Sequence, residues 1–456
     1  MKLKYTMAVG ALALATASQA QSWIADTVSM GVNYVDNIYY SLEHGQSGPA
    51  VPETNWHIAV QAISFAVPYH GGAGIWTNEA RKNGPSVKLY ALGKNATEFM
   101  TIAAADTVGK TGAAHALHND TSSYANGAFN AAATGSPFNY GWGNYYMAGA
   151  PGGYPDHSVV GDTLFLLNFE ASSMGGPVTI SKSYVFWPRA LVNGNEWTLY
   201  YRELGSTDVD TISISTAGSD KLFKYYNLET KQVLDREPAR TSWDFVFSNY
   251  MDLYGSQGLQ GVTGVLQNYN VSVAQADGTA PGSVDYTTIP ASNYDSALNT
   301  IGNDWKFLNG MSWSLTENRS YFIKVLNGDI WQVYFDYFAT QSGTSFRRIG
   351  LQKRKVYTKP PPVGIEAVNA FVSNLVVVPN PSVNGVTNLL VDVKQDLKNA
   401  QLTIVDLNGR VVMKTVKDIK SGFRQIPLNV SQYPAGIYMI NLSGAGFNTT
   451  QKMVVK

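Results

Sequence analysis

The sequence contains no cysteine among its 456 residues. A disulfide framework, a thiolate metal site and a cysteine nucleophile are therefore excluded, and stability must come from packing. Charge is also scarce, because only 14% of the residues are charged and 33 basic residues balance 33 acidic ones. A nucleic-acid-binding protein needs an excess of basic residues to release counterions, so no nucleic-acid partner is expected.

Long apolar runs are missing except at the start of the chain. Two lysines precede the small and apolar stretch Met7–Ala17, and Ser18-Gln19-Ala20 fits the small-x-small cleavage rule. Residues 1–20 are thus predicted to be a signal peptide, cleaved between Ala20 and Gln21. The alternative, a buried first helix, does not explain the charged start. No later run reaches the roughly 18 apolar residues of a membrane helix, so no membrane span is expected.

Aromatic and turn-forming residues are abundant instead. Hydrophobic residues make up 45% of the chain and aromatic residues 12%, whereas disordered chains are poor in both. The 27 tyrosines favour strands, and the 42 glycines favour turns between them. The length corresponds to about two to four domains. We therefore predict an all-β protein of several domains.

A composition break separates the last part of the chain. Pro360-Pro361-Pro362 lacks backbone donors and favours an extended conformation, which predicts a linker over residues 356–370. Beyond it, residues 371–456 alternate apolar runs with turns, and Asn408-Gly409 is a hairpin-turn signal. This pattern is typical of a small β-sandwich. The predicted strands are Leu375–Val378, Leu389–Val393, Leu402–Val405, Val411–Met413, Ile437–Leu442 and Met453–Val455.

Four short motifs follow one another in this region. Their defining residues are Pro379, Asn380 and Pro381, then Asp406, Asn408, Gly409 and Arg410, then Pro434, Gly436 and Tyr438, and finally Lys452 and Lys456. Over residues 376–456 this order resembles the type A C-terminal sorting domain of type IX secretion. Each turn alone is weak evidence, but here several motifs coincide. A generic terminal sandwich with an internal role is the alternative.

The resemblance to a sorting domain implies a route and a location. The chain would be exported to the periplasm by its signal peptide and carried across the outer membrane by the type IX secretion machinery. Such domains are usually removed, and the protein is anchored to surface lipopolysaccharide. The expected location is therefore secreted or on the outer-membrane cell surface.

The body before the linker contains a diverged duplication. Tyr39-Tyr40-Ser41-Leu42-Glu43 recurs as Tyr225-Tyr226-Asn227-Leu228-Glu229, and Thr54–Val60 recurs as Thr241–Phe247. Two copies favour a tandem pair of like domains, because a solenoid needs at least about three repeats.

We accordingly predict two related β domains, at residues 21–218 and 219–355. The first carries an insertion at about residues 103–162, rich in glycine, alanine and tyrosine, and loops of this length are usually functional or disordered. Its aromatic residues argue against disorder. In the second domain, residues 322–351 are expected to form a three-stranded meander with a turn at Asn327-Gly328.

Three features of the second copy carry a further resemblance. They are the strand Ser242–Phe247, the glycine-rich segment Tyr254–Gly258 and the late hairpin Tyr321–Tyr337 with its return through Gly343–Gly350. The body resembles the HmuY-like family of secreted haem-binding proteins, moderately over residues 223–352 and weakly in the first copy. The resemblance implies a haem site with two axial ligands, each histidine or methionine.

Six residues are candidates for such ligands: His115, His118, Met147, His157, Met251 and Met311. His115 and His118 are three residues apart and would share one face of a helical turn, a spacing that metal sites use. Nearby aromatic residues could sandwich a porphyrin, namely Tyr140, Trp142, Tyr145 and Tyr146. The alternative is that these histidines are ordinary polar loop residues. His57, which takes the place of Asp244 in the other copy, is expected to be a hydrogen-bonded structural residue.

Catalytic signatures are lacking. Ala171–Gly176 resembles a nucleophile elbow but has alanine where the leading glycine should stand, and no His-Glu-x-x-His zinc motif occurs. Asp208-Val209-Asp210 and Asp235-Arg236-Glu237 are predicted to be solvated turns. We therefore predict a surface binding protein that is not an enzyme and has no metal site, with haem or porphyrin as its ligand. The alternative is an adhesion protein that binds a glycan or another protein without haem.

Overall fold

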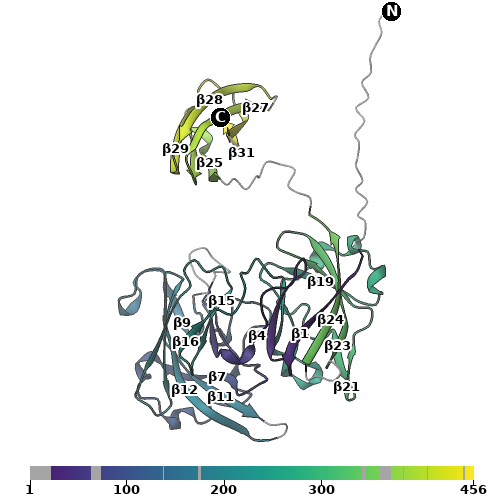
Figure 1. Ribbon diagram of the computed structural model, residues 1–456. Helices are drawn as coiled ribbons and strands as arrows, with labels where there is room; N and C mark the ends of the chain where they lie inside the picture. The colour runs from purple at the N-terminus through teal and green to yellow at the C-terminus, as the bar shows by residue number, and fades with distance from the viewer. Residues whose placement is uncertain are drawn as a thin grey trace, which may run out of the picture. The chain divides into compact units, whose positions relative to one another are not determined.

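The computed structural model describes residues 22–62, 73–136, 138–172, 176–340, 346–359, 371–383, 385–407, 409–444 and 447–456. The predicted signal peptide, its cleavage site, Asn408 and most of the predicted linker lie outside these residues. The chain divides between Lys359 and Pro360 into two compact units, which we call the body and the C-terminal unit (Figure 1).

Strands make up most of the regular structure, so the all-β prediction is confirmed. The helices among the described residues are short 3₁₀ turns. They are η1 (Glu53–Asn55), η2 (Ala96–Glu98), η3 (Ala104–Thr107), η4 (Ala128–Asn130), η5 (Pro151–Gly153), η6 (Gly255–Gln257), η7 (Pro281–Ser283), η8 (Tyr286–Thr288) and η9 (Ala291–Asn293). In this described part of the chain, no helix has the length and apolar character needed to cross a membrane.

The body consists of two halves in space, and each half contains strands from both copies of the duplication. The first half has two sheets around one core. The larger sheet has the order β14-β13-β12-β11-β7-β8, with β10 paired to β12 and β9 to β10. The smaller sheet has the order β16-β15-β5-β6. Apolar side chains of both sheets, such as Ile58, Phe165 and Trp197, meet in the core. The strands are β5 (Ile58–Gln61), β6 (Ile75–Thr77), β7 (Ser86–Asn95), β8 (Ala116–Leu117), β9 (Gly143–Tyr146), β10 (Ser158–Gly161), β11 (Thr163–Ser172), β12 (Val178–Val192), β13 (Glu196–Glu203), β14 (Asp210–Ser215), β15 (Phe223–Asn227) and β16 (Gln232–Leu234).

The second half has the same two-sheet plan. One sheet has the order β1-β24-β23-β22-β19 and the other β18-β17-β2-β3, with β4 also paired to β2. Their shared core includes Ile38, Phe247 and Tyr321. The strands are β1 (Ile24–Val32), β2 (Asp36–Ser41), β3 (Gly45–Gln46), β4 (Val51–Pro52), β17 (Phe245–Leu253), β18 (Leu259–Gln267), β19 (Ser272–Ala276), the separate hairpin β20 (Lys306–Asn309) and β21 (Ser312–Leu315), β22 (Ser320–Lys324), β23 (Ile330–Thr340) and β24 (Phe346–Tyr357).

Strand pairing crosses the domain boundary that we predicted near residue 218. Strand β2 lies before this boundary, yet it pairs with β17, placing Tyr40 opposite Phe245. Strand β15 lies after it and pairs with β5, placing Tyr226 opposite Ile58. The two pairings have the same register, because the four residues are equivalent in the duplication. The copies therefore complete each other's sheets instead of folding as consecutive domains.

The exchanged strands also bring the two halves together. Along each strand, alternate residues point to opposite faces. Four side chains of the exchanged strands point away from the two cores, namely Tyr39, Ala59, Tyr225 and Val246. Their neighbours along the strands point into the cores. The four side chains meet between the halves in a third group of packed residues, which also includes Trp243 and which we call the junction cluster.

Of two further predictions for the body, the meander is confirmed and the long inserted loop is wrong. The predicted meander is present as β22, β23 and β24. The insertion at residues 103–162 is not a long loop, because it contributes β8, β9 and β10 to the larger sheet. Phe129 and Trp142 from this segment are fully buried in the first core. Phe129 and Trp142 therefore serve packing, which composition alone did not indicate.

The C-terminal unit is the predicted β-sandwich. One sheet has the order β25-β26-β29 and the other β28-β27-β30-β31, and they share one apolar core. Strand β29 was not predicted, because it contains Pro427 and most of its side chains are exposed. The strands are β25 (Val372–Val383), β26 (Val386–Val393), β27 (Leu397–Asp406), β28 (Val411–Ile419), β29 (Gly422–Asn429), β30 (Gly436–Gly444) and β31 (Phe447–Val455).

Candidate functional site

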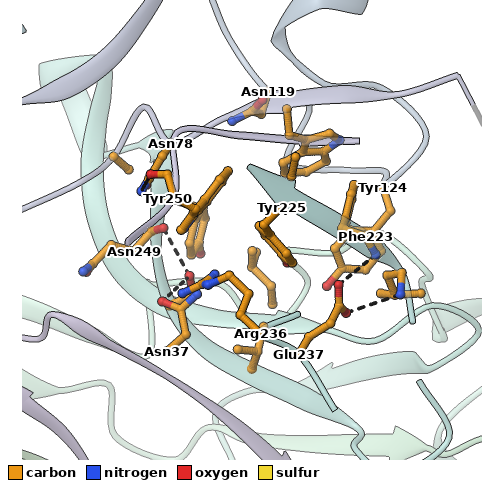
Figure 2. Close-up of a pocket in the computed structure, with 18 of the residues that line it drawn as sticks. Asn37, Asn78, Asn119, Tyr124, Phe223, Tyr225, Arg236, Glu237, Asn249 and Tyr250 are labelled. Carbon is orange, nitrogen blue, oxygen red and sulfur yellow. Dashed lines mark hydrogen bonds between the residues drawn. The ribbon is translucent and has the colours of Figure 1, made fainter. Parts of the chain in front are cut away.

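A cavity of about 90 Å³ lies within the junction cluster, between the two pairs of exchanged strands. Equivalent residues of the two copies line it, because Tyr39 corresponds to Tyr225 and Trp56 to Trp243. The duplication thus places one aromatic set on each side. Asparagines complete the wall, and Figure 2 shows Asn37, Asn78, Asn119 and Asn249 around the space. We call this space the junction cavity.

Glu79 lines the junction cavity, and Arg236 and Glu237 supply its other charges. They extend to different sides of it, Arg236 toward Asn37 and Glu237 toward Phe223 (Figure 2). The Nη2 of Arg236 donates to the carbonyl of Pro52 at 2.8 Å. This finding corrects the prediction that this acidic segment is a solvated turn, since Arg236 is 7% and Glu237 3% exposed. The one signal in the sequence for this burial is that both residues lie just before the repeated segment that contains Trp243.

Five buried N–H groups around the cavity have no hydrogen-bond acceptor among the described residues. Three are the indole N–H groups of Trp56, Trp76 and Trp243, and two are the Nε and Nη1 groups of Arg236. The guanidinium of Arg236 also lies 4.8 Å from the ring centroid of Tyr225. A buried donor without an acceptor costs about 1–3 kcal/mol. Residues that line the cavity therefore carry buried donors without acceptors.

The carboxylate of Glu237 is held by the backbone. It accepts hydrogen bonds from the N–H of Phe223 at 2.7 Å and of Leu222 at 3.4 Å. Burial outweighs these bonds and raises the pKa of Glu237 to about 7. The charge of Glu237 is therefore sensitive to pH near neutrality.

An open groove of about 740 Å³ adjoins the junction cavity along the same two chain segments. Residues 77–80 line the cavity, and Arg81 and Lys82 line the groove. On β17, residues 248–250 line the cavity and Met251 lines the groove. Both spaces thus lie where the two halves meet, and we call the second one the junction groove.

Two of the six predicted haem ligands, His118 and Met251, line the junction groove, from the first and second halves respectively. The Nδ1 of His118 lies 2.6 Å from Oε2 of the buried Glu79. His115 is exposed and precedes β8, whereas His118 follows it. The two histidines are therefore separated by a strand, and the predicted helical turn that carries both is wrong.

The other predicted ligands lie apart from the groove lining. Met147 is 63% exposed and Met311 is fully exposed. His157 contacts the hydroxyl of Tyr145 through Nδ1 at 2.6 Å. Trp142 is buried in the first core, where its indole N–H donates to the carbonyl of Ala73 at 2.9 Å. The predicted aromatic sandwich around a porphyrin is therefore not formed at Trp142.

His57 has the structural role that we predicted. It is fully buried, and its Nδ1 accepts a hydrogen bond from the N–H of Leu228 at 3.0 Å. Its ring stacks on that of Phe169, with 4.6 Å between centroids. Burial lowers the pKa of His57 to about 4, so the ring is neutral at physiological pH.

Among the described residues, no group of three histidine, aspartate or glutamate side chains is arranged to hold a metal ion.

The C-terminal motifs form turns and a link between strands. Asn380 joins β25 to β31, because its Nδ2 donates to the carbonyl of Lys452 and its Oδ1 accepts from the N–H of Val454, both at 2.8 Å. The side chain of Asp406 accepts from the backbone N–H and Nε of Arg410 across the turn that contains Gly409.

The third motif forms a similar local bond. The hydroxyl of Tyr438 donates to the carbonyl of Pro434 at 2.8 Å, two residues on either side of Gly436. Lys456 is exposed at the end of the chain. The motifs at Asp406 and Tyr438 thus make local hydrogen bonds in turns, whereas Asn380 joins two strands that are distant in sequence.

This region matches the family model described as a secretion system C-terminal sorting domain, over residues 376–456. Residues 376–456 are a type IX secretion C-terminal sorting domain. The sorting domain implies interaction with the type IX secretion machinery and makes the chain a secreted or cell-surface protein.

The other comparisons concern the whole chain. No curated protein matches the chain in sequence. Among solved structures, the crystal structure of dimeric latent PorU from Porphyromonas gingivalis is similar at 12% identity, with a TM-score of 0.16. The match covers 64% of this chain and 31% of that one. A TM-score this low supports no argument about the body.

Proposed function

We propose that the body is a surface-displayed binding protein, and that the junction cavity holds a neutral polar group of its ligand, such as one hydroxyl-bearing edge of the terminal sugar of a glycan. The observation that carries this proposal is the set of five buried N–H groups without acceptors around the cavity. Hydroxyl, ether and carbonyl oxygens of a ligand would accept from these donors and offset the cost of burying them.

The charges and the size of the cavity favour a small neutral group. Arg236 is opposed by the carboxylates of Glu237 and Glu79, which line the same cavity, so neither an anion nor a cation gains a clear advantage. A volume of about 90 Å³ is smaller than the roughly 150 Å³ that accommodates benzene. It fits one end of a longer molecule. Aromatic walls suit the apolar C–H faces of a sugar, while the N–H groups suit its oxygens.

Indole N–H resonances provide a direct test. A panel of neutral mono- and disaccharides is titrated into ¹⁵N-tryptophan-labelled full chain. We expect saturable shifts for Trp56, Trp76 and Trp243. Four other tryptophans already donate to backbone carbonyls and serve as internal controls that should not move: Trp142, Trp187, Trp197 and Trp305.

Substitutions sharpen this test. Trp243→Phe keeps the ring but removes one donor, and should weaken binding about fivefold to tenfold, as expected for one hydrogen bond of about 1 kcal/mol. Trp187→Phe, whose indole N–H donates to Gly161 outside the cavity, should bind as the unsubstituted chain does. Indole resonances that stay unchanged with every sugar would refute the proposed ligand site.

A second candidate function is haem binding in the junction groove, favoured by the presence of His118 and Met251 in its lining. The contact between Glu79 and Nδ1 of His118 would leave Nε2 for a ligand, and a carboxylate bonded to one ring nitrogen orients histidine ligands in metal sites. The HmuY-like resemblance of the body remains a prediction that this candidate would explain.

The Soret band of hemin tests the second candidate. A saturable, sharpened band that is lost in His118→Ala and Met251→Ala would support it. His115→Ala and Met147→Ala are matched controls, because both side chains are exposed and absent from the groove lining. A band no different from that given by an unrelated β protein would eliminate haem as the ligand.

A further inference from the structure

The lining of the junction groove has more positive than negative side chains. Three cationic side chains line it, namely Arg81, Lys82 and Lys88. Arg81 and Lys82 belong to the turn before β7, and Lys88 belongs to β7 itself. Apolar side chains also line the groove, namely Met251 and Leu259 from the second half and Val178 at the start of β12.

None of the three cations forms an ion pair within 4.0 Å in the part of the chain that the structure describes. Each donates to a neutral oxygen instead. Arg81 donates through Nε to the carbonyl of Asn83 at 3.2 Å. Lys82 donates to the hydroxyl of Thr263 and Lys88 to the carbonyl of Glu79. These bonds orient the side chains but leave their charges without a counter-ion.

The carboxylates near the groove are engaged elsewhere. Glu170, which lines the groove, accepts from the hydroxyl of Tyr90 at 2.8 Å and from Nδ2 of Asn168 at 3.0 Å. The buried Glu79 contacts His118 at 2.6 Å and accepts from the N–H of Asn119 at 2.7 Å. Glu53 and Glu229 act on Arg81 from beyond ion-pair distance. The lining therefore carries three positive charges against the one of Glu170.

From this arrangement we infer that the ligand of the junction is an acidic glycan, whose anionic sugar lies in the groove while one hydroxyl-bearing edge of a neutral sugar enters the junction cavity. This inference rests on the proposed function, because it assigns the cavity to the neutral end of the same molecule. Successive residues of two segments, 77–82 and 248–251, line first the cavity and then the groove, and in this proposal one extended ligand would reach both. Carboxylate and sulfate groups satisfy the same cations.

The test compares acidic glycans with neutral ones of the same backbone. An array of uronate-bearing and sulfated oligosaccharides, each printed beside its carboxyl-reduced or desulfated form, is probed with the full chain. The two acidic sets separate carboxylate from sulfate recognition. The best pair is then titrated by calorimetry. We expect the acidic form to bind at least about tenfold more tightly at low salt, and the difference to shrink as salt screens the charges.

Charge-removing variants locate the selectivity. Arg81→Gln, Lys82→Gln and Lys88→Gln in one chain should abolish the preference for the acidic form. A chain with Arg240→Gln, Lys324→Gln and Lys359→Gln undergoes the same change in net charge at exposed positions outside the groove lining and should keep the preference. Thermal unfolding verifies that both chains fold. If the triple variant does not fold, Lys88→Gln alone should still lower the preference severalfold.

The outcomes separate the two proposals. Equal affinity for acidic and neutral forms, with dependence on Trp243, would overturn the acidic ligand and leave the proposed function standing. Acidic selectivity that depends on the three cations but not on Trp56 or Trp243 would leave the groove as the site and overturn the role of the cavity. Binding to no glycan overturns both proposals, and hemin binding that requires His118 and Met251 would then assign the groove to haem.

Discussion

The backbone N–H of Leu42 donates a hydrogen bond of 2.7 Å to Oδ2 of Asp244. The duplicated partners make the equivalent bond, from the N–H of Leu228 to Nδ1 of His57 at 3.0 Å. In both cases the acceptor lies between a tryptophan and the strand that follows it in one copy, and the donor follows the other copy's paired tyrosines. This reciprocal contact holds each exchanged strand in the other half of the body.

Removal of the Asp244 carboxylate should destabilise the exchange. Leu42 is fully buried, so Asp244→Ala leaves its N–H without an acceptor and should lower the free energy of unfolding by about 1–3 kcal/mol. Asp244→Asn keeps an acceptor oxygen and should cost less. Urea unfolding measures both, with Asp208→Ala in an exposed turn as the control. Equal stability of the Asp244→Ala and control chains would contradict this role.

The stability of the body should depend on pH through Glu237. Burial raises its pKa from 4.5 to about 7, so the folded chain binds this proton more tightly than the unfolded chain. The resulting stabilisation is fully present below about pH 4.5 and is lost as pH rises through 7, by at most about 3 kcal/mol. Glu237→Gln should therefore lose less stability than the unsubstituted chain between about pH 5 and pH 8.

Comparison of the two chains isolates Glu237. His57 has a pKa lowered to about 4, so it contributes stability that rises with pH between about 4 and 6.5, the opposite sign. This contribution is common to both chains and cancels in the difference of their unfolding free energies. A pH dependence identical in the two chains would show that Glu237 does not titrate in the folded state as its burial requires.

In the sorting domain, Asn380 should protect the last strand. Asn380→Ala removes both hydrogen bonds to β31 and should destabilise the domain by about 1–2 kcal/mol, because the bonds are exposed and water replaces them in part. Amide hydrogen exchange at Val454 should become faster. Lys417→Ala, an exposed change on β28, is the control and should leave this exchange unchanged.

Delivery to the cell surface should require the sorting domain. A chain that ends at Lys359 is expected to accumulate inside a bacterium that has type IX secretion, whereas the full chain reaches the surface or medium. Cell fractionation and surface proteolysis measure the distribution. Circular dichroism of the truncated chain verifies its β structure, so that retention is not confused with degradation. If the truncated chain reaches the surface in the same amount as the full chain, the sorting domain is not required for delivery.

Local patterns explain why parts of the fold could be predicted. Strands β22 and β23 joined at Asn327-Gly328 follow from alternation and turn chemistry, both of which act within a few residues. The sorting domain was recognised from its motifs, of which those at Asp406 and Tyr438 make hydrogen bonds to residues four positions away. The bonds of Asn380 to β31 join residues 72 and 74 positions apart and depend on the folded sandwich. Strand β29 was missed because its exposed residues and Pro427 hide the alternation.

The candidate site could not be predicted in this way. Arg236 and Glu237 sit in a charged segment that reads as a surface turn, and their burial depends on Trp56, Tyr225 and Trp243. His118 and Met251 were singled out by residue type, but their shared groove arises only where the two halves meet.

The sequence by itself determined that this chain is an all-β protein with an internal duplication and a secretion sorting domain, because side-chain alternation, repeats and turn motifs are properties of short segments. The tertiary structure alone decided that β2 pairs with β17 and β15 with β5, and so created the junction cavity and groove. Alternation specifies which face of a strand is buried but not which strand lies beside it. That choice depends on the packing of residues far apart in the chain.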